Sequence, residues 1–192
     1  MEDNIALFGT SADPPTIGHK KILEELSNIY AFTISYVSNN PNKKHKQGIS
    51  IRSQLLKTLI KDLDNPRILF NQEVSSPWAF ESIKKCKKIY NLNSLDFVIG
   101  SDLIKDIICW KNFDKINQEV SFFIILRDGY PIESNTLKML EKYNVKFKIS
   151  SIKIPNISSS KFRLNFNYSN LPKSLIDIVK KNNLYESTKL IE

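Results

Sequence analysis

The 192-residue chain is poor in cysteine, glycine and histidine, with 2, 5 and 2 residues of these types. Cys86 and Cys109 lie far apart, without the spacing of a metal site or a disulfide framework, which is typical of a reducing compartment. The few glycines form neither the G-x-G-x-x-G pattern nor a P-loop. No apolar run reaches the roughly 18 residues of a membrane helix, and MEDNIALFG is unlike a signal peptide. We expect a soluble, cytoplasmic protein with no membrane partner.

Acidic residues are the scarcer charged class, with 20 Asp and Glu against 28 Lys and Arg, a net charge of +8. This balance favours anionic partners such as nucleotides, nucleic acid or acidic membranes. The basic residues form only two short clusters, NKKHK and KKCKK, and no long tail, so nucleic-acid binding is the less favoured interpretation. The lysines of the second cluster are expected to be a solvated helix face: Lys84, Lys85, Lys87 and Lys88.

Short apolar runs alternate with helical spacings along the chain. The runs predict strands at 4–8, 31–37, 67–70, 95–100, 120–126 and 145–150. Amphipathic spacing predicts helices at 16–30, 50–63, 76–91, 101–110, 134–143 and about 173–183. We expect Ser50 to cap the second helix and Pro77 to open the third. The alternation indicates an α/β fold with a doubly wound parallel sheet, in one domain over 1–192 with a small C-terminal helical appendage from about 157.

Ligands of a doubly wound sheet bind beyond the carboxyl ends of its strands, which directs attention to the residues after each strand. Gly9, Thr10 and Ser11 follow the first strand, and a helix begins near Thr16. Gly9 would let the backbone approach a ligand, and the free N–H groups of the helix start form an anion site. Thr16 and His19 share one face of the first turn. The pair suggests phosphoryl or nucleotidyl transfer, although each residue alone also fits an ordinary turn or surface position.

Other polar groups follow later elements. The segment ISSSKFR places hydroxyls before Arg163, so Ser158 or Ser159 could cap a helix that binds a polyanion, or the segment is an ordinary cap with a surface arginine. Asp102, after the strand ending at Gly100, could accept from a ribose or cap the next helix. Trp110 could stack on a heteroaromatic ring or belong to the core.

Seven segments together resemble the bacterial nicotinate-nucleotide adenylyltransferases: FGTSADPPTIGH, SNNPNKKHK, SSPWAFESI, FVIGSDLIKDIICWKNF, FFIILRDGYP, ISSSKFR and NNLYES. They run from about Ile5 to Ser187. The first segment alone fits the wider nucleotidyltransferase superfamily with its H/T-x-G-H signature, and the later ones narrow it. The resemblance implies a Rossmann-like fold and the transfer of adenylyl from ATP to nicotinate mononucleotide, giving deamido-NAD and pyrophosphate, with Mg²⁺.

The resemblance also implies residue roles. Thr16 and His19 would act on the ATP phosphates, and Lys46 would join them as a catalytic group, closing over the phosphates with His45. The remaining ATP-binding residues would be Gly9, Thr10, Ser11, Gly100, Asp102, Ser159, Ser160 and Arg163. On the acceptor side, Trp110 would stack on the pyridine ring beside Lys111. No side chain is assigned as a metal ligand, because Mg²⁺ would be held mainly by ATP phosphates and water.

The chain departs from the family pattern at Thr10, Ala12, Thr16, Ala79 and Lys111. The last two lie near the expected nicotinate site, where Lys111 could pair with the carboxylate. The acceptor therefore stays open, with nicotinamide mononucleotide or a pantetheine phosphate as alternatives. A nucleotide-binding protein without turnover is a further alternative, against which His19 and Arg163 argue. The sequence leaves the oligomeric state open, a homo-oligomer included.

Overall fold

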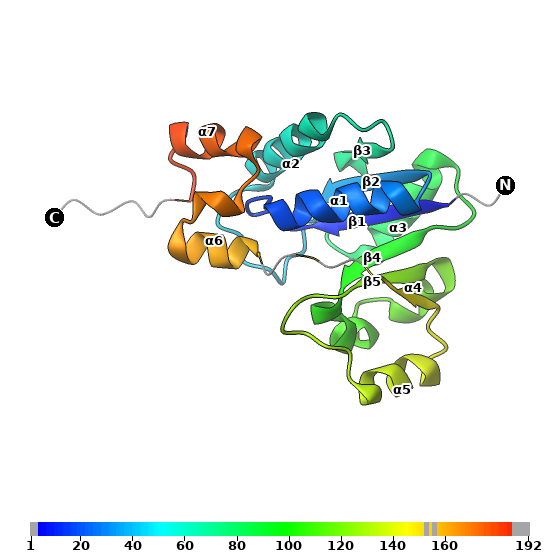
Figure 1. Ribbon diagram of the computed structural model, residues 1–192. Helices are drawn as coiled ribbons and strands as arrows, with labels where there is room; N and C mark the ends of the chain where they lie inside the picture. Colours follow the sequence, from blue (N-terminus) through cyan, green and yellow to red (C-terminus); the bar gives the residue numbers. More distant parts are fainter. Residues whose placement is uncertain (1–3, 152–153, 155–156, 186–192) are drawn as a thin grey trace.

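The computed structural model describes residues 4–151, 154 and 157–185. Within them, six strands form one sheet in the order β3-β2-β1-β4-β5-β6 (Figure 1). Every neighbouring pair is parallel. The strands are β1 (Ile5–Thr10), β2 (Phe32–Val37), β3 (Ile68–Phe70), β4 (Asp96–Gly100), β5 (Ser121–Ile125) and β6 (Phe147–Ile149). The predicted α/β class and the Rossmann-like, doubly wound parallel sheet are confirmed.

Helices cover both faces of the sheet, as Figure 1 shows. One face carries α1 (Ile17–Ile29) and α2 (Ile49–Leu63), and the C-terminal helices α6 (Ser159–Asn165) and α7 (Lys173–Lys181) join that layer. The other face carries α3 (Ala79–Tyr90), the 3₁₀-helix η2 (Ser101–Cys109), α4 (Phe113–Glu119) and α5 (Ser134–Lys142). Two short 3₁₀ turns are η1 (Gln72–Val74) and η3 (Tyr168–Asn170). No helix in the described segments has the length and apolar character needed to cross a membrane.

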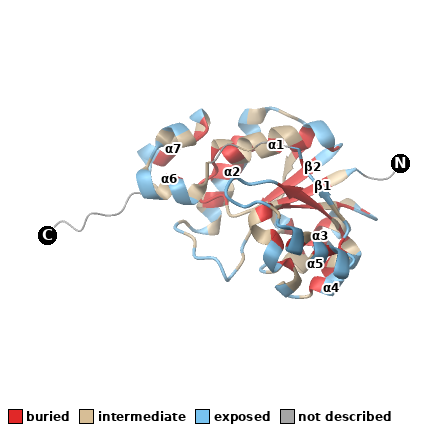
Figure 2. Cartoon of the chain, turned by 60° about the horizontal axis from the view of Figure 1, so that its bottom comes forward, coloured by how far each residue is buried: buried red, intermediate tan, exposed pale blue. Residues whose placement is uncertain are grey.

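Strand side chains alternate between two hydrophobic cores, one on each face of the sheet. In β1, Ala6 and Phe8 belong to the core under α1 and α2, whereas Leu7 belongs to the core under α3. In β5, Phe123 and Phe122 divide in the same way. Burial on both faces explains why these strands read as continuous apolar runs, and the buried sheet is visible between its helices in Figure 2.

Three local predictions are wrong. Ser50 lies inside α2, whose N-cap is Gly48, because the helix already includes Ile49, which packs against the core. Pro77 precedes α3 rather than opening it, since the extended Trp78 is the N-cap. Segment 101–109 is a 3₁₀-helix, because its buried residues recur every third position rather than at the α-helical 3.6.

Candidate active site

The chain changes direction within the sheet between β1 and β4. From β1 it runs outward through β2 to β3, then returns to β4 on the other side of β1 and continues to β5 and β6. Such a switch point opens a crevice at the carboxyl ends of the two central strands. Because β1 ends at Thr10 and β4 ends at Gly100, the topology brings two of the predicted polar groups to the same crevice.

The first of these groups is a hydrogen-bonded chain through His19. The backbone N–H of Thr16, the N-cap of α1, donates to Nδ1 of His19 at 3.1 Å, and the Thr16 hydroxyl lies 2.9 Å from the same atom. A backbone N–H can only donate, so Nδ1 accepts and the neutral ring carries its proton on Nε2. Nε2 lies 2.9 Å from the Thr10 hydroxyl at the end of β1.

His19 is held neutral by its surroundings. Burial, and to a smaller extent the positive charge of Arg127, lower the pKa of His19 from its ordinary 6.5 to about 4. At neutral pH the side chain therefore presents one N–H donor and no charge. It can bind a phosphate oxygen as a hydrogen-bond donor, whereas any positive charge in the crevice must come from arginine or lysine.

The start of α6 contacts the turn between β1 and α1. The hydroxyl of Ser158 caps α6 by accepting from Lys161 N, and Ser159 donates to the Pro14 carbonyl at 2.8 Å. Arg163 donates to the Asp13 carbonyl through Nη1, which also lies 3.7 Å from the Asp13 carboxylate. Its Nη2 donates to the hydroxyl of Ser160 at 3.2 Å. The structure therefore joins ISSSKFR to the first motif across about 150 residues of sequence.

Asp102, beyond β4, forms an ion pair with Arg127, whose Nη1 lies 2.9 Å from Oδ2. Ser101 reinforces the arrangement, since its hydroxyl accepts from Arg127 N at 2.9 Å and donates to the Tyr130 carbonyl at 2.7 Å. This ion pair requires glycine at position 100, because a Cβ there would collide with the carboxylate of Asp102 and lie 2.8 Å from Cδ of Arg127. The crevice thus holds an anion and a cation that neutralise each other.

Gly9 also has a steric role that the sequence did not indicate. A Cβ on Gly9 would lie 2.6 Å from the ring and hydroxyl of Tyr36, a side chain almost fully buried in β2. The space next to Gly9 is therefore filled by the protein itself. The expectation that this glycine makes room for a ligand lacks support from the packing.

The 38–48 loop approaches the same turn from the end of β2. His45 Nε2 lies 3.4 Å from the hydroxyl of Ser11. The backbone N–H groups of Lys46 and Gln47 donate to the Asp13 carboxylate at 2.7 and 3.2 Å. The Lys46 side chain itself is exposed. His45 and Ser11, which the sequence grouped only through the resemblance, are thus neighbours in space.

The two expected acceptor residues lie on the face of the sheet covered by α3. Trp110 is partly buried and packs edge-to-face on Phe97, with 6.3 Å between ring centroids, which favours its interpretation as a core residue. Lys111 places Nζ 4.8 Å from the ring centroid of Trp78 at the start of α3, a cation–π contact. Ala79, where the family pattern has a polar residue, is the first residue of the same helix.

Sequence reasoning missed three residues of this region: Asp13, Arg52 and Arg127. Arg127 was within reach, since it follows β5 and the rule applied to Gly100 applies equally to it. Asp13 follows β1 by three residues, so the same rule could have selected it. Arg52 sits inside an amphipathic helix, and nothing in the sequence distinguishes it from a surface arginine.

The carboxylates of the crevice are engaged by the protein. Asp13 accepts two backbone N–H groups, and Asp102 Oδ2 pairs with Arg127. In the described part of the chain, no three His, Cys, Asp or Glu side chains gather in a way that could hold a metal ion. Asp102 Oδ1 is buried without a hydrogen-bond partner. This donor set suits a magnesium ion bound mainly through substrate phosphates and water, with Asp102 nearby.

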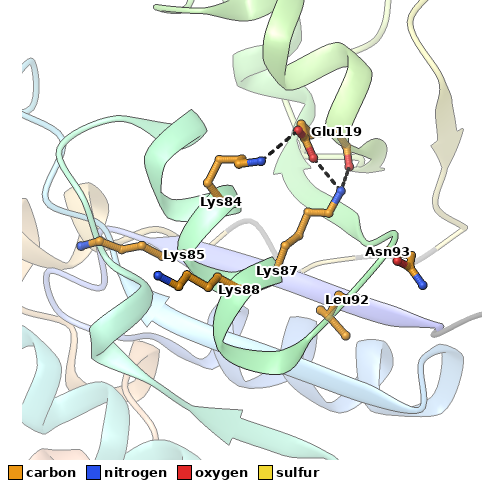
Figure 3. Close-up of a pocket in the computed structure, with 7 residues that line it drawn as sticks. All are labelled: Lys84, Lys85, Lys87, Lys88, Leu92, Asn93 and Glu119. Atoms are coloured by element: carbon orange, nitrogen blue, oxygen red, sulfur yellow. Dashed lines mark hydrogen bonds and ion pairs between the residues drawn. The ribbon is translucent and has the colours of Figure 1, made fainter.

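A cavity of about 560 Å³ lies elsewhere, at the end of α3, and its lining includes none of the predicted site residues. Figure 3 shows Lys84 and Lys87 reaching Glu119 of α4, whereas Lys85 and Lys88 point away from it. Lys84 and Lys87 both pair with this carboxylate, and the Lys87 side chain is only 17% exposed. The prediction of a solvated face is therefore wrong for Lys87, because the ion pair draws its side chain between the two helices. Lys84, Lys85 and Lys88 are exposed as expected.

The doubly wound sheet and the phosphate-binding chemistry at its switch point define a nucleotidyltransferase. Residues 7–165 match the model of the cytidylyltransferase-like family, and the chain belongs to this family. It is 30% identical to a Campylobacter fetus protein named probable nicotinate-nucleotide adenylyltransferase, over 93% of this chain and 95% of that protein. A Synechocystis protein of the same name is 27% identical over 94% and 98%.

A solved structure extends the likeness to three dimensions. Plasmodium falciparum nicotinic acid mononucleotide adenylyltransferase complexed with NaAD matches with a TM-score of 0.79 at 25% identity, over 96% of this chain and 98% of that one. The resemblance drawn from the seven sequence segments is confirmed by these comparisons.

Proposed function

We propose that this chain transfers the adenylyl group of ATP to nicotinate mononucleotide, releasing pyrophosphate and deamido-NAD. The observation that carries the proposal is the Thr10–His19–Thr16 chain at the switch point, which places the one N–H donor of His19 against the Thr10 hydroxyl at the carboxyl end of β1. The names of the Campylobacter and Synechocystis relatives and of the Plasmodium structure support the same acceptor.

In this reaction, a 5′-phosphate oxygen of the mononucleotide attacks the α-phosphorus of ATP, and the bond from that phosphorus to the bridging oxygen of pyrophosphate breaks. No protein atom forms a covalent bond, so the protein contributes alignment and charge stabilisation. The Nε2–H of His19 would leave the Thr10 hydroxyl and donate its hydrogen bond to an oxygen of the α-phosphate. This hydrogen bond would become stronger as negative charge develops on that oxygen in the transition state. Thr16 would keep the proton on Nε2 through its contact with Nδ1.

Positive charge for the departing pyrophosphate would come from arginine and lysine. Arg163, with its Nη2 on Ser160, would bind the β- and γ-phosphates together with Ser159. His45 and Lys46 would cover the phosphates from the 38–48 loop, next to Ser11. Asp102 would face the adenosine, with Gly100 beneath it. Mg²⁺ would neutralise phosphate charge when bound with ATP.

The acceptor side rests on Trp110 and Lys111. Trp110 is only partly buried, so its exposed edge would meet the pyridine ring while Phe97 supports the other side. Lys111 would leave Trp78 to pair with the nicotinate carboxylate. This charge would distinguish nicotinate from nicotinamide mononucleotide, which has no carboxylate.

The test is pyrophosphate release from ATP and Mg²⁺ with nicotinate mononucleotide, nicotinamide mononucleotide and phosphopantetheine as separate acceptors. We expect release with nicotinate mononucleotide at a kcat/KM at least about tenfold above the others, the scale of one charged contact. Equal rates with the nicotinamide form would overturn the acceptor assignment, and no release with any acceptor would overturn the enzyme itself.

The role of His19 has its own test. His19→Ala removes the donor, and we expect kcat to fall by at least ~100-fold, the scale for losing a transition-state hydrogen bond. Circular dichroism and a thermal melt of the variant establish that it is folded. A loss below tenfold in a folded variant would mean that His19 does not contact the reacting phosphate.

A further inference from the structure

Arg52 of α2 is a buried arginine with an unusual set of partners. Its exposed fraction is 2%. Nη1 donates to the carbonyls of Ser11 at 2.8 Å and Ser38 at 3.1 Å, and Nε donates to the carbonyl of Gln47 at 3.0 Å. These carbonyls belong to the turn after β1, the residue after β2 and the end of the 38–48 loop. One guanidinium therefore ties together three backbone segments that border the crevice.

Asp13 holds the same loop from the opposite side. It is 2% exposed, and its carboxylate accepts the N–H groups of Lys46 and Gln47. Both backbone groups of Gln47 are thus bound, its N–H to Asp13 and its carbonyl to Arg52. The loop supplies no buried apolar side chain of its own between 38 and 48. Its position on the site depends on these polar contacts.

The chemistry of this contact suits arginine better than lysine. Burial lowers the pKa of Arg52, and the nearby Asp13 charge opposes that change. A buried charge is costly unless its hydrogen bonds are made. The guanidinium makes them from two nitrogens held in a rigid plane, Nε and Nη1, whereas the three N–H groups of a lysine ammonium all come from one atom and are not pre-arranged to fit these carbonyls.

We propose that Arg52 is a positioning residue for adenylyl transfer: with Asp13 it fixes the 38–48 loop against the turn after β1, so that His45 and Lys46 are held over the phosphates. The inference rests on the proposed function for its catalytic consequence, while the positioning itself can be measured on the free protein. When the contacts of Arg52 are lost, the loop opens, and only the closed fraction binds substrate well. Apparent affinity then falls with that fraction, whereas saturating substrate restores closure.

The experiment compares Arg52→Gln and Arg52→Lys with Leu59→Ala. Leu59 lies in the same helix with no exposed surface, in the hydrophobic core, so its truncation lowers stability without touching the loop contacts. Trypsin cleavage after Lys43, Lys44 and Lys46, followed by mass spectrometry, reports opening of the loop. Steady-state pyrophosphate release reports KM and kcat, and thermal melts report global stability.

We expect Arg52→Gln to accelerate cleavage at these three lysines by about tenfold and to raise KM for both substrates by about tenfold, with kcat changed less than threefold. Arg52→Lys should recover part of both effects. Leu59→Ala should lower Tm while leaving KM and the loop cleavage within twofold of the parent chain.

The proposal is overturned if Leu59→Ala opens the loop as much as Arg52→Gln, or if Arg52→Gln lowers kcat while KM and cleavage stay unchanged. Should Arg52→Gln fail to fold, Arg52→Lys decides between the same outcomes. Should the parent chain release no pyrophosphate with any acceptor, the proposed function fails, and the cleavage comparison still decides whether Arg52 holds the loop.

Discussion

Acidification is expected to destabilise the protein through His19. Its pKa of about 4 in the folded chain lies below the 6.5 of the unfolded chain, so between these values the unfolded chain binds the proton and the folded chain does not. The free energy of unfolding therefore falls as the pH drops from 6.5 to 4. The full depression corresponds to about 3 kcal/mol, with a slope of up to about 1.4 kcal/mol per pH unit inside the window.

Urea unfolding at a series of pH values between 7.5 and 4 measures this slope. Carboxylates such as Glu119, whose pKa the lysines of α3 lower, also titrate at the acidic end of the range. His19→Gln isolates the histidine, because glutamine keeps a polar group at the position and has no proton to gain. We expect the parent chain to lose about 3 kcal/mol more than the variant over the range.

NMR gives an independent measurement, since the chain has only two histidines and the variant assigns them. The ¹⁵N shifts should identify a neutral His19 ring protonated on Nε2 throughout pH 5.5–8. A titration midpoint of 6 or higher for His19, or equal pH dependence in the parent and His19→Gln, would refute the burial argument, and ¹⁵N shifts that place the proton on Nδ1 would refute the tautomer derived from the Thr16 contact.

Three further substitutions follow from the same structure. Ser158→Ala removes the cap of α6 and should cost about 1 kcal/mol in urea unfolding, whereas Ser158→Asn should restore most of it; no loss would exclude the cap. Arg127→Gln should raise the NMR-measured pKa of His19, because a positive charge near the ring is removed; a lower pKa would contradict this. Lys111→Glu should raise KM for nicotinate mononucleotide at least about tenfold by like-charge repulsion. An unchanged KM would mean that Lys111 contacts only Trp78 and does not bind the acceptor.

The fold was predictable because its four central strands, β1, β2, β4 and β5, are buried on both faces and its helices on one. A buried strand is a short continuous apolar run, whereas a helix buried on one side repeats its apolar residues every 3.6 positions. This difference allowed each strand of the sheet to be assigned from the sequence, together with the order in which strands and helices alternate. The 3₁₀ character of η2 was not indicated by the sequence. Its apolar residues Leu103, Ile104, Ile107 and Ile108 have the spacing of an amphipathic α-helix, and the three-residue period appears only in the residues that the structure buries.

The site was predictable only in part, and the missing part consists of long-range polar contacts. The carboxyl ends of β1 and β4 had to meet once the sheet was doubly wound, which joined Thr10 and Gly100. No local pattern, however, records that Arg163 reaches Asp13 or that Arg52 binds three carbonyls. Burial inverts the usual expectation for such a residue, because an arginine in an amphipathic helix is normally on the exposed side.

For Gly9 the structure adds a reason that the sequence does not contain. A missing Cβ after a strand often makes room for a ligand, and here a Cβ would also collide with Tyr36. Ala12, in contrast, adopts a φ of 46°, in the left-handed region that favours glycine, and no sequence signal indicated it. The turn after β1 is therefore shaped by a non-glycine residue in a glycine conformation.

Thr16 explains how the chain can depart from the family signature without losing the chemistry. A histidine at this position would bring a titratable group into a fully buried site, where desolvation disfavours its charged form, so little positive charge would be gained. Threonine instead is the N-cap of α1 and places its hydroxyl 2.9 Å from Nδ1 of His19, while the backbone N–H of residue 16, which a histidine would also have, fixes the proton of His19 on Nε2. Because His19 is itself neutral, the positive charge that the proposed ATP site needs would come from Arg127 and Arg163, each already paired with an aspartate. Substrate phosphates would compete with these aspartates, so ATP affinity should depend on the strength of the internal pairs more than on the residue at position 16.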